Sequence, residues 1–557
     1  MSISQTIKNT QHVYDLVELC TCMGVRNAVL CPGSRCAPLL IGFGKHKKIN
    51  AISVTDERSA GFIGLGIAQQ SGTPVVLVCT SGTAGQNFAP AVTEAFYQNV
   101  PLIILTADRP VEWIDQWDGQ TIHQQSLYAE HIRGQFDFVP GKAAFKKAET
   151  LLRLSLHPVP GPVHINIPIR KPFYPKKLGD VQFPVLNITP FTRSASKISE
   201  TSWNALDQVF QSSKKLLLIA GQQRLDKTLL SDIYQLGIPL MGDIISNTHP
   251  NNYTIPATDS FFDIENNSIR PDVLITIGRS VISEKLKHYF RKYKPENHWH
   301  IGRGMIGDPF QSITATIQAR PRDFFATCLK RRLRINDQTN WKKQLKQRHK
   351  QVHTHITKSI RSNTLNQFIA IQIIMNALPK KNITLHLGNS MPVRVANIVG
   401  IKNSEIEVFS NRGTSGIDGI LSTAVGHALA EPTQLHTLII GDLAFFYDRN
   451  GFWLNQPFPD NLKTIVMNNK GGGIFSILPG PSDQEELLSL FTTPQQRSIQ
   501  LTAKEFSLNY FLANSLALLK GKINTFLASP KASILEILIQ PKEDKHIFSQ
   551  LNNEAKK

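Results

Sequence analysis

The stretches HTLIIGDLAFFYD (436–448) and TIVMNNKGGGIF (464–475) decide the fold of the C-terminal part of the chain. Each opens with an apolar run of strand length and passes directly into polar residues and glycine. This pattern is typical of a buried parallel strand with a loop at its carboxyl end. Asp442 ends the first run, and Asn469 ends the second, 27 residues later. Because the carboxyl ends of parallel strands meet at one edge of a sheet, we expect these two side chains to lie together.

The same alternation of apolar runs and amphipathic stretches divides the chain into three blocks. We predict an α/β fold with three domains, at residues 1–185, 200–345 and 365–557, each a parallel sheet flanked by helices. A proline-rich stretch at 168–190 is interpreted as a linker. The first and third blocks are alike in size and pattern, so we expect two related domains on either side of a middle one. The strand-like runs are NAVLCPG, AISVTDE, PVVLVCTSG, PLIILTADRP and PVHINIP in the first block, KLLLIAGQQ, GIPLMGDIISN and PDVLITIGRS in the second, and NITLHLGNS, IEVFSNRG, HTLIIGDLAFF, KTIVMNN and ASILEILIQ in the third.

Two further stretches have a helical character. IDGILSTAVGHALA (417–430) is rich in small residues, which predicts a helix packed closely on a sheet. NWKKQLKQRHKQVHTHI (340–356) is basic and polar, and runs of charge usually face water. We therefore interpret it as a solvated connector between the second and third blocks.

Composition limits the classes of function. Lys and Arg number 61 and Asp and Glu 42, giving a net charge of +19 that attracts anions. The basic residues are spread along the chain without a nucleic-acid motif, so we predict small anionic substrates and no nucleic acid. Six cysteines, five of them in the first 80 residues, are too clustered to cross-link the chain, which favours reduced thiols and a cytoplasmic location. No apolar run approaches the roughly 18 residues of a membrane span, so we expect no membrane insertion.

The pair Asp442 and Asn469 has the chemistry of a magnesium site. Mg²⁺ takes one or two protein oxygens together with phosphate oxygens and water. The carboxylate of Asp442, the amide of Asn469 and the backbone carbonyl of Gly471 provide such oxygens, and the neighbouring glycines let the chain approach a diphosphate closely. Either residue alone would be explained as a helix cap or a turn residue. Their combination at this spacing favours a site for a metal ion and a diphosphate.

A second candidate lies in TDERSAGFIGLGIAQQSG (55–72), where an apolar strand ends in the carboxylate of Glu57 and a small-residue helix follows. A carboxylate held in an apolar pocket has the raised pKa that proton exchange with a bound group needs. The alternative explanation is an acidic residue that complements the dipole at a helix N-terminus. The metal site in the third block favours the catalytic interpretation.

The GD…NN pair resembles the metal- and diphosphate-binding motif of the thiamine-diphosphate enzyme family, although Leu443 stands where many members have a glycine. Further motifs extend the resemblance over nearly the whole chain, to a branch that decarboxylates 2-oxoglutarate and adds the succinyl unit to isochorismate in menaquinone biosynthesis. The resemblance implies thiamine diphosphate and Mg²⁺, or Mn²⁺ in its place, as cofactors. It also implies a homodimer or homotetramer, with the pyrimidine-binding first block of one chain facing the diphosphate-binding third block of another. The motifs are CPGSRCAPLL (31–40), TDERSAG (55–61), CTSGTAGQN (79–87), PLIILTADRP (101–110), QTIHQ (120–124), GPVHINIP (161–168), GNSMPVR (388–394), NRGTSGIDG (411–419) and NNKGGGIFSILP (468–479).

The resemblance also assigns roles to individual residues. It makes Glu57 the catalytic carboxylate that faces the aminopyrimidine ring. Isochorismate would face Ser34, Arg35, Arg109 and Gln120, and the succinyl carboxylate would face Arg394 and Arg412. The cofactor would contact Glu57, Ser390, Ile417, Gly441, Asp442, Asn469, Gly471, Ile474 and Phe475, with Asp442, Asn469 and Gly471 on the metal.

The residue chemistry agrees independently, because two dicarboxylate substrates require several arginine forks and all four arginines are expected at strand ends. Two positions depart from the pattern of the family. Glu284 stands where a substrate-facing lysine is usual, which makes the adjacent Lys285 the candidate substitute. Gly119 stands where some relatives have asparagine.

Two other classes of function compete with this interpretation. Another thiamine carboligase, acting on a small uncharged acceptor, fits poorly with the arginines of GNSMPVR and NRGTSGIDG. A non-catalytic ligand-binding α/β protein would have no need to keep Glu57, Asp442 and Asn469 together. The sequence therefore favours the decarboxylating carboligase.

Overall fold

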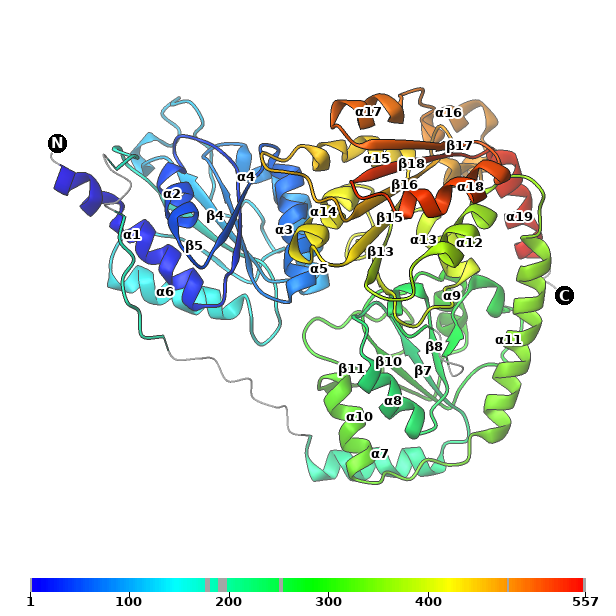
Figure 1. The fold of residues 1–557 in the computed structure, drawn as a ribbon. Helices are drawn as coiled ribbons and strands as arrows, with labels where there is room; N and C mark the ends of the chain where they lie inside the picture. The colour runs from blue at the N-terminus through cyan, green and yellow to red at the C-terminus, as the bar shows by residue number, and fades with distance from the viewer. Residues whose placement is uncertain (1–2, 176–180, 189–197, 250–253, 478–479, 554–557) are drawn as a thin grey trace.

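The computed structural model describes residues 3–175, 181–188, 198–249, 254–477 and 480–553. It contains three six-stranded sheets, and all fifteen strand pairings are parallel. Helices flank each sheet, and the first and third sheets lie side by side, while the second lies beside the third (Figure 1). The predicted α/β class is confirmed, and each sheet falls inside one of the three predicted blocks. Residues 176–180 and 189–190 of the predicted linker lie outside the described residues.

The first and third sheets have the same topology. Their strand orders are β2-β1-β3-β4-β6-β5 and β14-β13-β15-β16-β18-β17, which coincide when each block is numbered from its own first strand. The strands of the first sheet are β1 (Asn27–Leu30), β2 (Asn50–Ser53), β3 (Val75–Cys79), β4 (Leu102–Asp108), β5 (Gln135–Asp137) and β6 (Val163–Pro168), and those of the third are β13 (Ile383–Leu387), β14 (Glu407–Phe409), β15 (Leu435–Gly441), β16 (Leu462–Asn468), β17 (Asn509–Ala513) and β18 (Ser533–Leu538).

The middle sheet has the order β12-β11-β10-β7-β8-β9. The sequence pattern predicted three of its strands and missed β9, β11 and β12. In β11 the reason is chemical, because His298 and His300 interrupt the apolar run, yet both are buried and lie 3.0 Å from the hydroxyl of Thr276. The strands are β7 (Leu216–Ala220), β8 (Leu240–Gly242), β9 (Thr254–Pro256), β10 (Val273–Ile277), β11 (Asn297–Gly302) and β12 (Ala315–Gln318).

The helices cover the sheet faces and join the blocks. In the first block they are α1 (Ile3–Cys22), α2 (Ala37–Lys45), α3 (Glu57–Ser71), α4 (Ala84–Asn87), α5 (Ala89–Gln98) and α6 (Lys142–Leu154); in the second, α7 (Glu200–Ser212), α8 (Lys227–Gln235), α9 (Glu284–Lys292), α10 (Pro321–Lys330) and α11 (Thr339–Ser359); in the third, α12 (Gln367–Ala377), α13 (Met391–Val399), α14 (Ile420–Ala430), α15 (Asp442–Tyr447), α16 (Leu488–Thr492), α17 (Ile499–Glu505), α18 (Leu516–Leu527) and α19 (Pro541–Asn553). None of the described helices is both long enough and apolar enough to cross a membrane.

Helix α11 corrects the interpretation of 340–356 as a solvated connector. Trp341, Leu345, Val352 and Ile356 form an apolar stripe that is buried, and the indole of Trp341 donates to the carbonyl of Leu216 at 2.8 Å. The basic residues occupy the remaining faces of the helix. The connector is therefore part of the core, because its sparse apolar residues recur at helical spacing.

The small-residue helix α14 packs most closely against the helix α3. The sequence predicted instead that its closest contact would be with a sheet. A Cβ added at Gly66 of α3 would lie 2.1 Å from the carbonyl oxygen of Thr423, and one added at Gly426 would lie 2.1 Å from that of Ile63. The two backbones touch because glycine leaves no side chain between them. This contact joins the first and third blocks around one core.

Replacing Gly426 by Ala is expected to lower the free energy of unfolding by about 1–3 kcal/mol, because a methyl group would overlap a backbone oxygen in a tight helix pair. Urea denaturation measures the change. Gly521 of α18 is the control, since a Cβ there meets nothing within 4 Å. Gly521→Ala should leave stability unchanged or raise it by up to about 1 kcal/mol. If both variants changed the free energy of unfolding equally, the α3–α14 contact would have space for an added methyl group.

Candidate active site

The metal site predicted from the GD…NN pair lies at the carboxyl edge of the third sheet. Strands β15 and β16 are neighbours, with Gly441 opposite Met467 in register, so the residues that follow them meet. Asp442 is 1% exposed, and burial raises its pKa to about 6 against the opposing hydrogen bond from Gln495. The amide of Gln495 donates to Asp442 Oδ2 at 2.7 Å and holds that side of the carboxylate.

The opposite oxygen of Asp442 belongs to a cluster that fits a cation. The terminal atom of the Asn469 amide that faces this corner lies 3.2 Å from Asp442 Oδ1 and 2.6 Å from the carbonyl oxygen of Gly471. If the Asn469 atom at this corner is the amide oxygen, it faces Asp442 Oδ1 and the carbonyl oxygen of Gly471, and none of the three can donate a hydrogen bond. A hard cation binds such a group of oxygens. With the amide turned over, its NH₂ group would donate to both neighbours. Gly471 has a φ of +156° and lies against Thr492, so the chain bends closely around this corner.

Ser390 lies beside this edge, at the start of α13, in a strained conformation. Its φ of +69° is uncommon for a residue with a side chain, and such strain concentrates at functional sites. The carbonyl of Ser390 accepts from Arg394 Nη1 at 2.8 Å.

The other predicted cofactor residues of the third block lie nearby in the sequence of elements. Gly441 ends β15 directly before Asp442, Ile474 and Phe475 lie in the short helix η6 (Gly473–Ser476), and Ile417 is 41% exposed before α14. The structure thus gathers the third-block candidates at one sheet edge, and their roles stay predictions.

Arg394, which is half-buried, and Arg412, which is buried, form a cationic pair at the same edge. Arg412 Nη1 donates to Asn389 Oδ1 at 3.3 Å, and its buried Nε has no hydrogen-bond partner among the described residues. Burial lowers the pKa of both guanidinium groups, and at Arg412 the neighbouring charge of Arg394 adds to this effect. Two desolvated cations with an unused N–H favour an anionic ligand, as expected for a carboxylate site.

Glu94 fixes the loop that carries Arg412, and the sequence analysis missed it. Its carboxylate, 1% exposed, accepts from Gly413 N at 2.8 Å, Thr414 N at 2.6 Å and Thr414 Oγ1 at 2.7 Å. The signal was present, since Glu94 is the one charged residue of helix α5 and yet lies in a mostly apolar stretch. A buried carboxylate requires hydrogen-bond donors, and here a loop of the third block supplies them.

Glu57 is the first residue of α3 and is partly buried. Burial raises the pKa of its carboxyl group, and the neighbouring charge of Asp56 acts in the same direction. Glu57 and Gln120 line one cavity of about 460 Å³ together with residues 80–84 of the loop after β3. Gln120 itself has a φ of +60°. The cavity is lined by first-block residues alone, as far as the described residues show.

The other first-block candidates surround Arg35, which is 2% exposed. Its Nη1 donates to the carbonyl of Ile169 at 2.6 Å, its guanidinium stacks on Phe173 at 4.6 Å, and its Nε and Nη2 lack partners among the described residues. Burial lowers the pKa of Arg35 to about 10, and the nearby charge of Arg109 contributes. Arg109 donates to Gln120 Oε1 at 3.3 Å, and Ser34 is exposed next to Arg35. The predicted isochorismate residues are therefore neighbours.

The middle block brings Glu284 and Lys285 to the arginine pair. The backbone N–H of Lys285 donates to Asp259 Oδ1 at 3.1 Å, at the N-terminus of α9. Asp259 and Glu284 both raise the pKa of Arg394 by their charge, against the larger lowering effect of burial. The side chain of Lys285 is only partly exposed, and its proposed substitution for the usual lysine stays a prediction.

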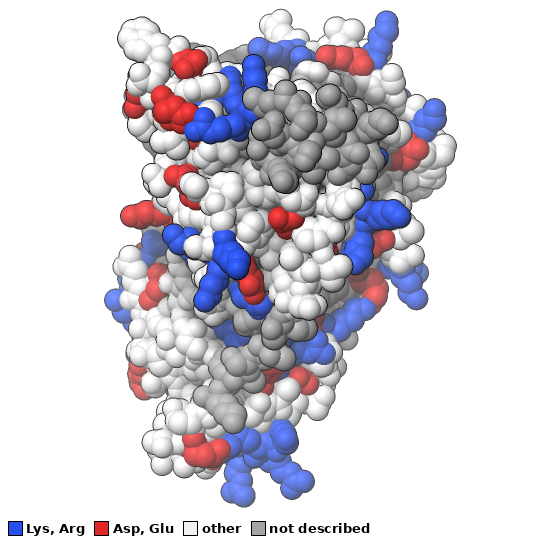
Figure 2. All heavy atoms as spheres, turned by 90° about the vertical axis from the view of Figure 1, so that its left-hand side faces the viewer, with Lys and Arg blue, Asp and Glu red and all other residues white. Residues whose placement is uncertain are grey.

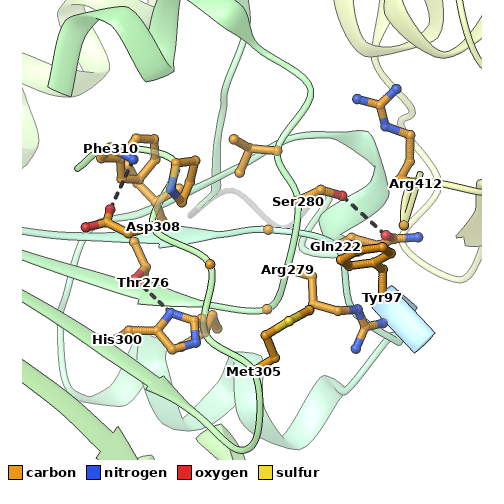
Figure 3. A pocket seen from close by; sticks show the side chains of 18 residues that line it. Tyr97, Gln222, Thr276, Arg279, Ser280, His300, Met305, Asp308, Phe310 and Arg412 are labelled. Atoms are coloured by element: carbon orange, nitrogen blue, oxygen red, sulfur yellow. Dashed lines mark hydrogen bonds between the residues drawn. The ribbon is translucent and has the colours of Figure 1, made fainter. Parts of the chain in front are cut away.

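A cavity of about 400 Å³ opens at the carboxyl ends of β7 and β10 in the middle block. Figure 3 shows Arg412 at its border beside Tyr97 and Gln222, across the cavity from Asp308 and His300. The cavity therefore connects the middle sheet with the loop that carries Arg412. On the face of the molecule in Figure 2, basic and acidic side chains are interspersed and form no continuous basic stripe.

Comparison with known proteins defines the class. Residues 13–127 match the N-terminal thiamine pyrophosphate-binding domain of thiamine pyrophosphate enzymes, and residues 185–385 match the middle domain of that family. Curated relatives identify one family among the thiamine pyrophosphate enzymes. Proteins named 2-succinyl-5-enolpyruvyl-6-hydroxy-3-cyclohexene-1-carboxylate synthase (SEPHCHC synthase) are similar to the chain over nearly its full length.

The protein from Cytophaga hutchinsonii is 40% identical, covering 97% of this chain and 98% of its own. Those from Flavobacterium psychrophilum and Porphyromonas gingivalis are 36% and 35% identical, covering 95% and 94% of this chain and 96% and 93% of their own. The chain belongs to the SEPHCHC synthase family, which confirms the family resemblance found in the sequence.

Proposed function

We propose that the chain is a thiamine-diphosphate-dependent transferase that decarboxylates 2-oxoglutarate and adds the succinyl unit to isochorismate, with release of SEPHCHC and CO₂ in menaquinone biosynthesis. The observation that carries the proposal is the carboxyl edge of the third sheet. There, the side chains of Asp442 and Asn469 and the carbonyl of Gly471, groups of the kind that Mg²⁺ binds, meet on the same edge as the half-buried Arg394 and the buried Arg412, which favour carboxylates. The names of the curated relatives support the same reaction.

The chain's own groups divide the work. Asp442, Asn469 and the carbonyl of Gly471 would hold Mg²⁺, or Mn²⁺ in its place, and the metal ion would hold the diphosphate. When bound, thiamine diphosphate supplies the electron sink for the loss of CO₂. Glu57 would keep a proton available to the aminopyrimidine ring, a role that its raised pKa favours.

Two sets of residues would bind the two substrates. Arg394 and Arg412 would hold the distal carboxylate of 2-oxoglutarate, with Lys285 as a further candidate. Ser34, Arg35, Arg109 and Gln120 would hold isochorismate. The remaining third-block residues would contact the cofactor, namely Ser390, Ile417, Gly441, Ile474 and Phe475.

The two substrate sets can be separated experimentally. Arg412→Met should raise KM for 2-oxoglutarate and slow CO₂ release in a single turnover with 2-oxoglutarate alone, by roughly ten- to hundred-fold, because a charge-assisted contact is lost. Arg35→Met keeps an unbranched side chain, removes the guanidinium that stacks on Phe173, and should leave that first turnover nearly unchanged. Its defect should appear only after isochorismate is added. Equal impairment of the first turnover by both variants would contradict the assignment.

A homodimer is proposed as the minimum unit, because the family resemblance implies that the first block of one chain faces the third block of another. Each active site would then combine Glu57 of one chain with Asp442 of another. A cytoplasmic location is proposed as well, in keeping with six cysteines that form no disulfide.

Mixing two inactive variants tests this arrangement. Glu57→Gln and Asp442→Ala chains, unfolded and refolded together, should regain roughly a quarter of wild-type activity, because half of the dimers would carry one intact site. A mixture of Glu57→Gln with Glu57→Ala is the control and should regain nothing. No recovery in the first mixture, with dimers verified by native mass spectrometry, would place both residues of a site in one chain.

A further inference from the structure

The turn that carries Glu57 is held along its whole length by a segment of the third block. Asn455 donates from its backbone to the carbonyl of Ser53 at 3.4 Å, and from its side chain to Ser53 Oγ at 3.1 Å and Thr55 Oγ1 at 3.2 Å. Val54 and Leu454 form an isolated antiparallel bridge. These contacts fix the chain on the N-terminal side of Glu57.

The C-terminal side is fixed by Arg58. Its Nη2 donates to the carbonyl of Tyr447 at 2.5 Å, and its guanidinium lies 4.4 Å from the centre of the Tyr447 ring. Tyr447 ends α15, the helix that begins at Asp442. The segment 447–455 therefore begins at the end of α15, the helix that the proposed metal ligand opens, and it contacts residues on both sides of Glu57.

Asp56 is the link nearest to Glu57. Its Oδ1 accepts from the backbone N–H groups of Arg58 at 2.9 Å and Ser59 at 3.2 Å, which caps α3. Its Oδ2 accepts from Asn450 Nδ2 at 2.7 Å. Asn450 thus occupies the one carboxylate oxygen that the helix cap leaves free, and it does so with a neutral donor.

Glu57 has no comparable support of its own. Among the described residues, no other side chain is hydrogen-bonded to its carboxylate, which faces the cavity shared with Gln120. A carboxylate that must meet a bound ring has to be held in place through its backbone. The residues on either side of it carry the fixed contacts, and a small displacement of a catalytic group costs much of its effect.

We propose that Asn450 is a positioning residue for Glu57, acting through Asp56 from the other domain of the chain. The inference rests on the proposed function, because it takes Glu57 as the group that exchanges a proton with the cofactor. The proposal requires an amide side chain at position 450. An amide donates to Asp56, whereas an aspartate of the same shape would place two carboxylates against each other.

The test compares variants at the contact with one elsewhere. Asn450→Asp removes the donor at constant shape, and Asn450→Ala removes the whole amide. The double variant Asp56→Asn with Asn450→Asp restores an amide–carboxylate pair of reversed polarity, and asparagine also caps helices. Asn403→Ala is the control, because the amide of Asn403 also connects two segments, donating to the carbonyls of Pro379 and Lys380.

Three quantities are measured on each purified full-length variant. The rate of hydrogen–deuterium exchange at C2 of bound thiamine diphosphate, followed by quenched NMR, reports the proton function of Glu57 without any substrate. Titration calorimetry gives the Kd of thiamine diphosphate in Mg²⁺, and thermal unfolding without cofactor gives the stability of the protein.

Asn450→Asp should slow C2 exchange by about ten- to hundred-fold, with Kd changed less than about two-fold, since only the placement of Glu57 is disturbed. The double variant should recover most of the rate, and Asn403→Ala should match the wild type. An unchanged exchange rate in Asn450→Asp would overturn the proposal. So would a loss that follows a lowered unfolding midpoint and is not recovered by the double variant. Glu57→Gln serves as the reference variant. If C2 exchange in Glu57→Gln were as fast as in the wild type, the proposed role of Glu57 would be contradicted, and the result would say nothing against the contact of Asn450 with Asp56.

Discussion

Replacing Glu57 by Gln is expected to lower turnover by about a hundred- to ten-thousand-fold, the range over which a positioned acid or base contributes. Glutamine keeps the size and the start of α3 but cannot exchange the proton. Burial and Asp56 raise the pKa of the native carboxyl group, which makes this position suited to proton exchange. The affinity for thiamine diphosphate, measured by titration calorimetry, should change little.

Glu149→Gln is the control for this variant. Glu149 lies on α6 of the same block and pairs with Arg153 at the surface, an interaction of about 0.5 kcal/mol or less. It should keep full turnover. Near wild-type turnover in Glu57→Gln would contradict the proposed proton-exchange role of Glu57, and it would leave the family assignment unaffected.

Replacing Asp442 by Ala is expected to weaken Mg²⁺-dependent binding of thiamine diphosphate by at least about a hundred-fold, because a hard oxygen ligand and its charge are lost together. The free amide of Gln495 and the remaining oxygens of Asn469 and Gly471 would not replace that charge. Calorimetric titration with and without EDTA measures the effect.

Asp460→Ala is the matched control for the metal site. Asp460 lies just before β16, at the opposite end of the strand from Asn469, and is exposed. It should bind the cofactor as the wild type does. Unchanged affinity in Asp442→Ala would place the metal elsewhere.

The sequence predicted those parts of the molecule that depend on local pattern. Asp442 and Asn469 could be paired because both follow apolar strand runs, and neighbouring parallel strands bring such residues together. Glu57 could be singled out because a carboxylate stands between an apolar run and a small-residue helix; in the structure β2 ends at Ser53 and Glu57 opens α3, and its role stays a prediction. The class of fold followed from the same alternation.

The residues that hold these groups could not be predicted in this way. Gln495 lies 53 positions from Asp442 in a stretch without a motif. Asn450 meets Asp56 across 394 positions, and Glu94 meets Thr414 across 320. Each is an ordinary polar residue whose role depends on which segments the tertiary fold brings together. For α11, the basic composition hid an apolar stripe of four residues that the core uses.

The most direct test of the central claim is identification of the product. The purified chain, mixed with 2-oxoglutarate, isochorismate, thiamine diphosphate and Mg²⁺, should release one CO₂ for each molecule of SEPHCHC that mass spectrometry detects. Omitting isochorismate should stop formation of that product, and omitting Mg²⁺ should stop both products. Release of CO₂ without any consumption of isochorismate, in a protein that binds the cofactor, would contradict the proposed reaction.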